Sequence, residues 1–369
     1  MARKIISAGH ICLDITPVFP HTVKGQTLEA LLQPGKLLHM AGADVHTGGS
    51  VANTGLALKI LGTDVTLLSK IGKDAFGGMV KSIVASYGAD GLIEDGDSST
   101  SYSVVLAIPG YDRIFLHDPG ANDSFSDADI PEEALRDADL FHFGYPPLMR
   151  RMYLDGGIEL RRMFHRMKEH GLATSLDLAA VDPGSDAGQA DWRGILKAVL
   201  PDVDFFVPSF EELCYMLDRE RYDRLNTGGD ITEGLDLRAE ALPLAEELIA
   251  MGCRAVLIKC GTSGMVYKTA GAEALQKLGD RVSLDIPSWA DKEGVQPCFR
   301  AEIVRSGTGA GDTSIAAFLT AVLHGYGPAE SAALAAAEGA CSVTAYDALS
   351  GLKPIEKLAE KIRAGWETL

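Results

Sequence analysis

One aspartate directly follows a run of glycines near the carboxyl end of the chain. From Ser306 to Asp312 the sequence reads SGTGAGD, and an apolar helical pattern follows. Glycine lets the backbone turn sharply and lets an anion come close, and the N–H groups at the start of a helix bind phosphate oxygens. A carboxylate there would repel phosphate. Its presence makes sense if it takes the proton of a hydroxyl that attacks the phosphate. The stretch therefore predicts phosphoryl transfer with Asp312 as general base.

Two better-known glycine motifs do not fit this stretch. A Walker loop needs a lysine after its last glycine, and none follows here; a dinucleotide fingerprint would place its third glycine at Asp312. A simpler interpretation remains, in which Asp312 caps a helix after a flexible loop and carries no chemistry. These residues alone do not separate the two interpretations.

The composition argues against several classes of partner and location. The 369 residues carry a formal net charge of -17, with 51 acidic and 34 basic side chains, so neither nucleic acid nor an anionic membrane is expected as a partner. Six cysteines without a CxxC pair indicate neither a zinc site nor a disulfide framework, and they favour a cytoplasmic location. Without a long apolar run, secretion and membrane insertion are not expected.

The rest of the chain alternates between strand and helix patterns, and these elements are expected to hold the reacting groups in place. Strand patterns occur at 4–8, 64–69, 138–144, 172–178, 204–209 and 255–261, and helical patterns separate them. Such units predict one α/β domain over 1–369, a three-layer sandwich in which helices flank a mostly parallel central sheet. Runs on either side of Pro109-Gly110 predict a hairpin. With strands from 15–46, the hairpin region at 98–120 would form a small β lid.

The segments around the glycine turn are predicted in the same way. The apolar run 301–304 is expected to be a strand that leads into the turn. After the turn, one helix face carries the apolar residues Ile315, Phe318, Leu319, Val322 and Leu323. The polar stretch 218–236 shows little periodicity and is expected to be a surface insertion.

An aspartate near the amino end follows the first strand pattern. Asp14 lies just beyond 4–8, where open α/β sheets bind ligands, although a turn aspartate before Pro17 would look the same. Arg113 lies on the expected hairpin. It is predicted either to face solvent or to contact an anionic substrate or the transferring phosphate.

The ordered motifs resemble the ribokinase-like (PfkB) carbohydrate kinases, from Ile5 to about Gly351. The family's C-terminal signature typically reads D-T-x-G-A-G-D, and the residues from Gly309 to Asp312 match its core. The resemblance implies Asp312 as catalytic base, ATP and Mg²⁺ as cofactors, and an anion hole formed by the backbone of Gly309, Ala310 and Gly311.

The chain departs from that signature at two positions. Ser306 and Gly307 stand where Asp and Thr are usual. Because the usual Asp is tied to a monovalent-cation site, the resemblance leaves open whether such a cation is needed.

The resemblance also assigns residues to the two substrates. Its sugar-binding motif GGxxxN matches this sequence, and the acceptor is assigned to Asp14, Gly48, Gly49 and Asn53, with Arg113 added from the hairpin. In the family's N-x-x-E motif, Ser209 replaces the Asn and Glu212 is the residue that helps to hold magnesium. The remaining contacts to ATP are assigned to Ser209, Lys259, Gly261 and Gly264.

The sequence therefore predicts an ATP-dependent kinase that phosphorylates a primary hydroxyl of a sugar or sugar-like molecule. A nucleoside kinase with the same machinery is an alternative, with an aromatic slot built from Phe115, Phe125 and Tyr145. A second alternative is a sugar-binding regulator with weak or no catalysis, suggested by the departures at 209, 306 and 307. The missing fingerprint disfavours a dinucleotide-dependent oxidoreductase. Exposed edges of the lid suggest a homodimer that pairs through it.

Overall fold

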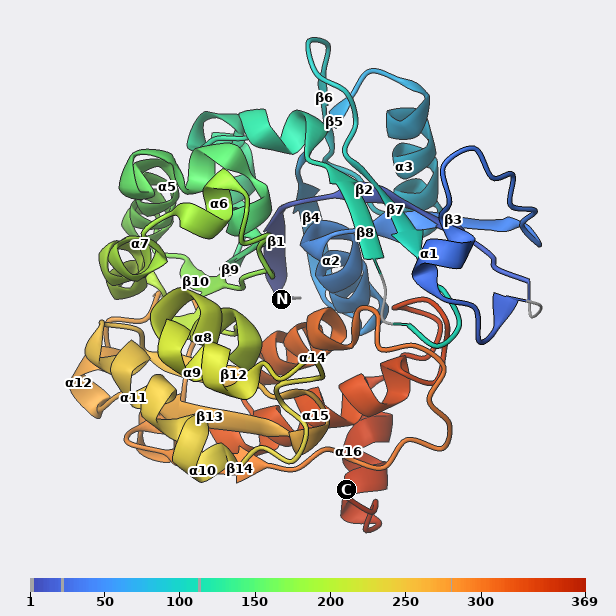
Figure 1. The fold of residues 1–369 in the computed structure, drawn as a ribbon. Coiled ribbons are helices and arrows are strands. Elements are labelled where there is room, and N and C mark those ends of the chain that lie inside the picture. Colours follow the sequence, from blue (N-terminus) through green and yellow to red (C-terminus); the bar gives the residue numbers. More distant parts are fainter. Residues whose placement is uncertain (1–2, 21–22, 112–113, 280) are drawn as a thin grey trace.

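The computed structural model describes residues 3–20, 23–111, 114–279 and 281–369. Its main sheet has the strand order β14-β13-β12-β11-β10-β9-β1-β4 (Figure 1). The strands are β1 (Lys4–Gly9), β4 (Asp64–Leu68), β9 (Leu140–Gly144), β10 (Ala173–Leu176), β11 (Phe205–Phe206), β12 (Ala255–Lys259), β13 (Met265–Thr269) and β14 (Glu293–Gln296). Neighbours from β12 to β4 run parallel, whereas β13 and β14 are antiparallel. The predicted mostly parallel sheet is confirmed.

Helices cover both faces of this sheet, with an apolar core on each side (Figure 1). One core includes residues of α2 (Ser50–Ile60), α3 (Ala75–Ser86), α14 (Ala310–Leu323), α15 (Pro328–Ser342) and α16 (Ile355–Arg363). The other includes residues of α4 (Glu132–Asp137), α5 (Ile158–Glu169), α7 (Trp192–Val199), α8 (Phe210–Leu217) and α11 (Leu242–Ala250). Because strand side chains alternate between faces, the strands β1, β4, β9, β10, β11, β12 and β13 contribute to both cores. The predicted three-layer α/β architecture is confirmed.

Short elements connect these layers. The short helices are α1 (Leu28–Leu31), α6 (Asp186–Gln189), α9 (Arg219–Leu225), α10 (Leu237–Glu240), α12 (Ala272–Leu275) and α13 (Ile286–Trp289). A two-stranded parallel sheet joins β5 (Lys70–Gly72) to β6 (Ile93–Asp95). Next to it, Asp74 caps α3 by accepting a hydrogen bond from the Gly77 N–H, 2.8 Å away.

A second, four-stranded sheet stands beside the main one. Its order is β3-β2-β7-β8, with β2 (Cys12–Pro17), β3 (Ala43–Gly48), β7 (Tyr102–Leu106) and β8 (Ile114–Asp118). Strands β7 and β8 form the expected antiparallel hairpin. The small sheet is thus confirmed. Its role as a lid, and the single domain over 1–369, stay predictions. Arg113 lies outside the described residues.

Three details differ from the sequence predictions. Residues 301–304 form no strand in the described chain, and Ile303 and Val304 are 52% and 72% exposed; β14 completes this edge of the sheet instead. Residues 219–225 are helical rather than irregular, because Asp218 caps α9. The third difference is α14, which is buried on all sides from Asp312 to Leu323 rather than on one face. It packs between α2 and α15, where small side chains permit close approach.

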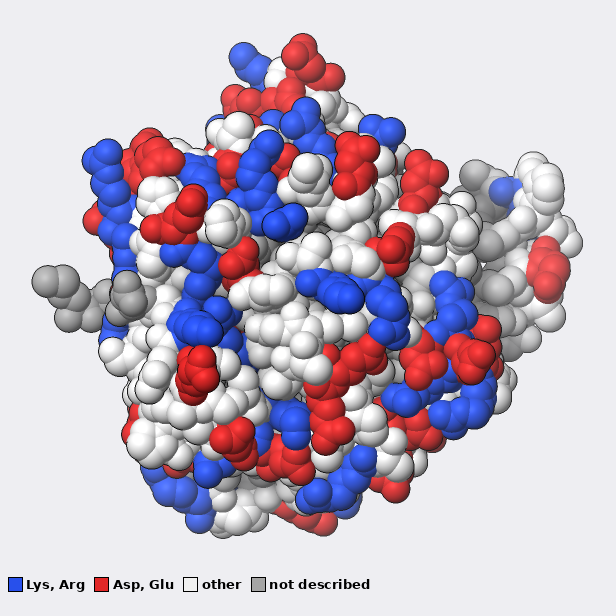
Figure 2. All heavy atoms as spheres, turned by 90° about the vertical axis from the view of Figure 1, so that its left-hand side faces the viewer, with Lys and Arg blue, Asp and Glu red and all other residues white. Residues whose placement is uncertain are grey.

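The surface view shows mixed charge rather than a patch of one sign. In Figure 2, lysines and arginines lie among aspartates and glutamates over the visible face. Within the described residues, no helix is both long and apolar enough to cross a bilayer.

A buried acid in α15 destabilises the fold as the pH rises. Glu338 is fully buried; its Oε1 accepts a hydrogen bond from the Lys353 N–H at 3.0 Å, whereas Oε2 has no partner. Burial raises the pKa of Glu338 from 4.5 to about 8. Between these values the unfolded chain loses a proton that the folded chain keeps, so the free energy of unfolding falls across this window.

We therefore expect Glu338→Gln to stabilise the protein at pH 8, by on the order of 2–4 kcal/mol, and to have little effect near pH 4.5. Gln keeps the acceptor for Lys353 but has no proton to lose. Urea unfolding at both pH values measures the difference. Glu330→Gln, an exposed position on α15, is the matched control. An equal effect of Glu338→Gln at both pH values would contradict the prediction.

Candidate active site

The polar residues of the site gather at one edge of the main sheet. The carboxyl ends of parallel strands meet there, which is where open α/β sheets bind ligands. Tyr145 and Asp177 directly follow β9 and β10, and Lys259 is the last residue of β12. The amino end of α14 carries Asp312, which contacts Tyr145. Segments far apart in the sequence thus form one site.

The glycine turn before α14 has a backbone that only glycine suits. Gly309 is the N-cap of α14 and has φ +74°, and a Cβ there would lie 2.2 Å from the Cβ of Ala348. The Ala310 N–H donates a long hydrogen bond of 3.4 Å to the Gly307 carbonyl. A Cβ on Gly311 would lie 3.8 Å from Nζ of Lys259, so a cation lies beside the predicted anion hole.

Asp312 is 4% exposed and surrounded by hydrogen-bond donors. Its Oδ2 accepts from Asn53 Nδ2 at 3.0 Å, and its Oδ1 accepts from Thr54 Oγ1 at 3.3 Å. The Tyr145 hydroxyl lies 2.8 Å from Oδ1 and 2.9 Å from Oδ2. Burial raises the pKa of Asp312, while the charge of Lys259 and the bonds from Asn53 and Tyr145 oppose that shift.

A buried ion pair lies next to this carboxylate. Nζ of Lys259 is 2.8 Å from Oδ1 of Asp177, and the two side chains are 12% and 2% exposed. Burial raises the pKa of Asp177 and Lys259 opposes the shift. Burial would lower the pKa of Lys259, but Asp177 and Glu212 raise it overall, so the lysine stays charged. Lys259 therefore brings a fixed positive charge to the anion hole.

The predicted acceptor residues lie on the side of the second sheet. Asp14 on β2 pairs with His46 on β3, and Gly48 pairs with Cys12, two residues away along β2. A Cβ on Gly48 would lie 2.1 Å from Oδ2 of Asp14. Gly49 has φ +84° and packs on His10, whose carbonyl would lie 2.6 Å from a Cβ there. Both glycines thus allow close approaches that a larger residue would block.

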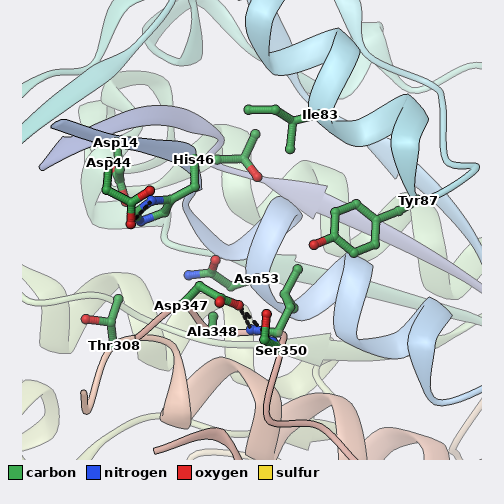
Figure 3. Close-up of a pocket in the computed structure, with 12 residues that line it drawn as sticks. Asp14, Asp44, His46, Asn53, Ile83, Tyr87, Thr308, Asp347, Ala348 and Ser350 are labelled. Atoms are coloured by element: carbon green, nitrogen blue, oxygen red, sulfur yellow. Dashed lines mark hydrogen bonds and ion pairs between the residues drawn. The ribbon is translucent and has the colours of Figure 1, made fainter. Parts of the chain in front are cut away.

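A cavity of about 220 Å³ opens beside these residues. In Figure 3, Asp14, Asp44 and His46 lie on one side of it, the loop from Asp347 to Ser350 on another, and Asn53 between them. Ile83 and Tyr87 close the side of α3. Asn53 both lines the cavity and contacts Asp312, so it links the two parts of the site.

The predicted nucleotide residues form a separate group around β12. Ser209 is the N-cap of α8 and exchanges hydrogen bonds with Glu212 in a capping box. Ser209 also pairs with Lys259 across a β-bridge. Gly261 and Gly264 have φ +52° and +111°, which glycine adopts readily in a tight turn. The cavity that Asp14 and Asn53 line is not lined by Ser209, Lys259, Gly261 or Gly264.

The carboxylate of Glu212 can still serve a metal. One oxygen, Oε2, accepts from the Ser209 N–H at 2.8 Å, which leaves Oε1 available. The described residues contain no cluster of three side chains that would hold a metal by themselves. Mg²⁺ in kinases takes one or two carboxylates plus phosphate oxygens and water, so a lone Glu212 fits this ion.

Two residues at the site escaped the sequence analysis. Asp177 lies inside the predicted strand pattern 172–178, whereas β10 ends at Leu176. Asp177 therefore follows a strand, at the kind of position that singled out Asp14. Tyr145 follows β9 in the same way, although the sequence suggests it only as a wall for a nucleobase. Its contact with Asp312, 167 positions away, gives no sequence signal.

The aromatic slot expected of a nucleoside kinase does not form. Phe125 is fully buried in the core, Phe115 is 55% exposed on β8, and Tyr145 contacts Asp312. None of the three lines the cavity, because they lie on three different elements that face different surroundings. The one aromatic residue that lines it within the described chain, apart from His46, is Tyr87.

The chain is similar to known proteins over most of its length. A family model described as pfkB family carbohydrate kinase matches residues 22–354. Fructokinase-2 of Oryza sativa subsp. japonica is 26% identical over 197 residues, which cover 52% of this chain and 56% of that protein. The chain thus spans about half the length of the curated relatives it matches.

Solved structures share the fold over nearly the whole chain. The ribokinase of Arabidopsis thaliana complexed with ribose and ATP has a TM-score of 0.69 and 19% identity, and 98% of each chain is covered. The fructokinase with bound ATP from Xylella fastidiosa has a TM-score of 0.70 and 18% identity, with 99% of each chain covered. At such low identity the likeness shows the fold alone.

Proposed function

Because the chain belongs to the pfkB family of carbohydrate kinases, we propose that it transfers the γ-phosphoryl group of ATP to a primary hydroxyl of a sugar or sugar-like molecule. One observation carries the proposal. Asp312 lies at the start of α14, beside the cation of Lys259, and shares Asn53 with the adjoining cavity. A base, an anion site and an acceptor cavity therefore meet at one point.

Each group has a role in the transfer. Asp312 takes the proton of the acceptor hydroxyl as its oxygen bonds to the γ-phosphorus and the bond to ADP breaks. The N–H groups at the start of α14, including those of Gly309 and Gly311, and the charge of Lys259 stabilise the equatorial phosphoryl oxygens. Glu212 would hold magnesium through its free oxygen, and the ion supplies charge neutralisation on the triphosphate.

The cavity favours an uncharged acceptor rich in hydroxyl groups. Asp14 and Asn53 can accept hydrogen bonds from a diol, and no lysine or arginine is among the described residues that line the cavity. Three aspartates, Asp14, Asp44 and Asp347, line it instead, and they would repel a carboxylate or phosphate on the acceptor. A nucleoside remains a second candidate, because the ring of Tyr87 offers one aromatic wall.

The proposal is tested by ATP consumption with magnesium against neutral pentoses and hexoses, keto-deoxy acids and nucleosides. We expect turnover with a neutral sugar and none with the acids. Turnover only with nucleosides would select the second candidate. If no acceptor is phosphorylated while a sugar still raises the melting temperature, the chain is a sugar-binding regulator and the proposal fails.

The expected homodimer stays a proposal as well. Exposed apolar side chains on both edge strands of the second sheet, Val45 on β3 and Phe115 and Leu116 on β8, would be covered in a pair formed through that sheet.

A further inference from the structure

The Tyr145 hydroxyl lies against both carboxylate oxygens of Asp312, the proposed base. It sits 2.8 and 2.9 Å from the two oxygens of Asp312, and Asn53 and Thr54 donate to the same oxygens from other directions. An ionised carboxylate offers about four acceptor sites. Asn53 and Thr54 take one each, and the single proton of the Tyr145 hydroxyl lies within reach of both oxygens. While the phenol lies there, a second hydroxyl cannot occupy the same position against the two oxygens.

The position of Tyr145 is built into the backbone. Its φ of 66° and ψ of 42° lie in the left-handed region. Only three non-glycine residues of the described chain have a positive φ. Such a conformation is unfavourable for a bulky residue and persists where its surroundings impose it. Pro146 and Pro147 follow directly and restrict the chain, and the ring stacks on His10 at 6.2 Å between centroids. The hydroxyl is therefore held in front of Asp312.

A general base beside bound ATP creates a hazard. A carboxylate that can deprotonate an alcohol can also deprotonate water, which would then attack the γ-phosphorus and waste ATP. Building on the proposed kinase function, we propose that Tyr145 is a latch that blocks Asp312 until an acceptor hydroxyl displaces the phenol. The released base then takes the acceptor's proton, and the phosphoryl group passes to the acceptor oxygen. Tyr145 is only partly buried, which leaves its side chain room to move aside.

Tyr145→Phe tests the latch because it removes the hydroxyl and keeps the ring that stacks on His10. The assay measures ADP release from ATP and magnesium without acceptor, and phosphoryl transfer with acceptor. We expect acceptor-free hydrolysis to rise about tenfold, the scale of one hydrogen bond to a charged group, and the ratio of hydrolysis to transfer to rise with it. Tyr153→Phe, a half-buried tyrosine that packs near Trp192, is the matched control and should change neither rate.

The double variant Tyr145→Phe with Asp312→Asn shows which group activates the water. Its acceptor-free hydrolysis should return to background, because the latch acts through Asp312. Unchanged hydrolysis in Tyr145→Phe would overturn the latch. So would a large loss of transfer in that variant, since it would make the phenol a required proton carrier.

A measurement on the unmodified protein keeps the inference testable if Tyr145→Phe folds poorly. An acceptor analogue that lacks the reacting hydroxyl cannot displace the phenol, so it should not stimulate ATP hydrolysis; stimulation would contradict the latch. Failure of the latch leaves transfer by the unmodified protein intact. If instead the unmodified protein phosphorylates no acceptor, it is the proposed function that has failed.

Discussion

Asp312→Asn is expected to lower kcat by about 10²–10⁴, the scale of a lost general base, with little change in the binding of ATP or acceptor. Asparagine has nearly the same shape and keeps an acceptor for Asn53, Thr54 or Tyr145, but its amide cannot take a proton. Steady-state kinetics with both substrates measure the effect. Asp64→Asn is the control, because Asp64 is exposed and begins β4 at the opposite edge of the sheet.

The pH dependence of turnover should identify the same carboxyl group. Burial raises the pKa of Asp312 above the ordinary value of 3.8, and only the ionised form acts as a base. Activity should therefore fall as the pH drops through this raised pKa, and the residual activity of Asp312→Asn should lack that limb. A kcat unchanged by Asp312→Asn would exclude Asp312 as the base.

Lys259→Met is expected to have the second large effect, on both turnover and stability. It removes the cation beside Gly311, which should lower kcat by about 10²–10³. It also leaves the buried carboxyl group of Asp177 without its partner at 2.8 Å, which should cost about 3–5 kcal/mol of unfolding free energy. Kinetics and urea unfolding on the same preparation report the two effects.

A double variant separates these two roles of Lys259. Adding Asp177→Asn to Lys259→Met removes the unpaired buried acid, so most of the lost stability should return. The lost turnover should not return, because the anion hole still lacks its cation. Recovery of turnover together with stability would mean that Lys259 only supports the fold.

The layered fold was predictable because its signals are local. Strand patterns such as 138–144 and 255–261 alternate with helices at a spacing that allows only a parallel sheet covered on both faces. The error at 301–304 has a physical cause, since a short apolar run cannot show whether a sheet edge is already occupied. The helix α14 is buried on every side, but periodicity cannot reveal this, because small residues such as Ala316 and Ala317 give no clear apolar signal.

The site was predictable in part, for a similar reason. Glycines that need unusual backbone angles, such as Gly49 and Gly309, stand out in sequence, and so does the aspartate that follows a glycine turn. The assigned roles of these residues stay predictions. The contacts of Tyr145 with Asp312, and of Lys259 with Asp177, join distant segments that the fold alone brings together.

The most direct test of the account is to follow phosphoryl transfer itself, by phosphorus NMR of ATP, magnesium and the best neutral sugar with the unmodified protein and with Asp312→Asn. We predict a new phosphomonoester signal that grows as ADP forms, and its near absence with the variant. ADP that forms without a phosphorylated sugar, or equal product from both proteins, would contradict the claim that Asp312 directs transfer to a sugar hydroxyl.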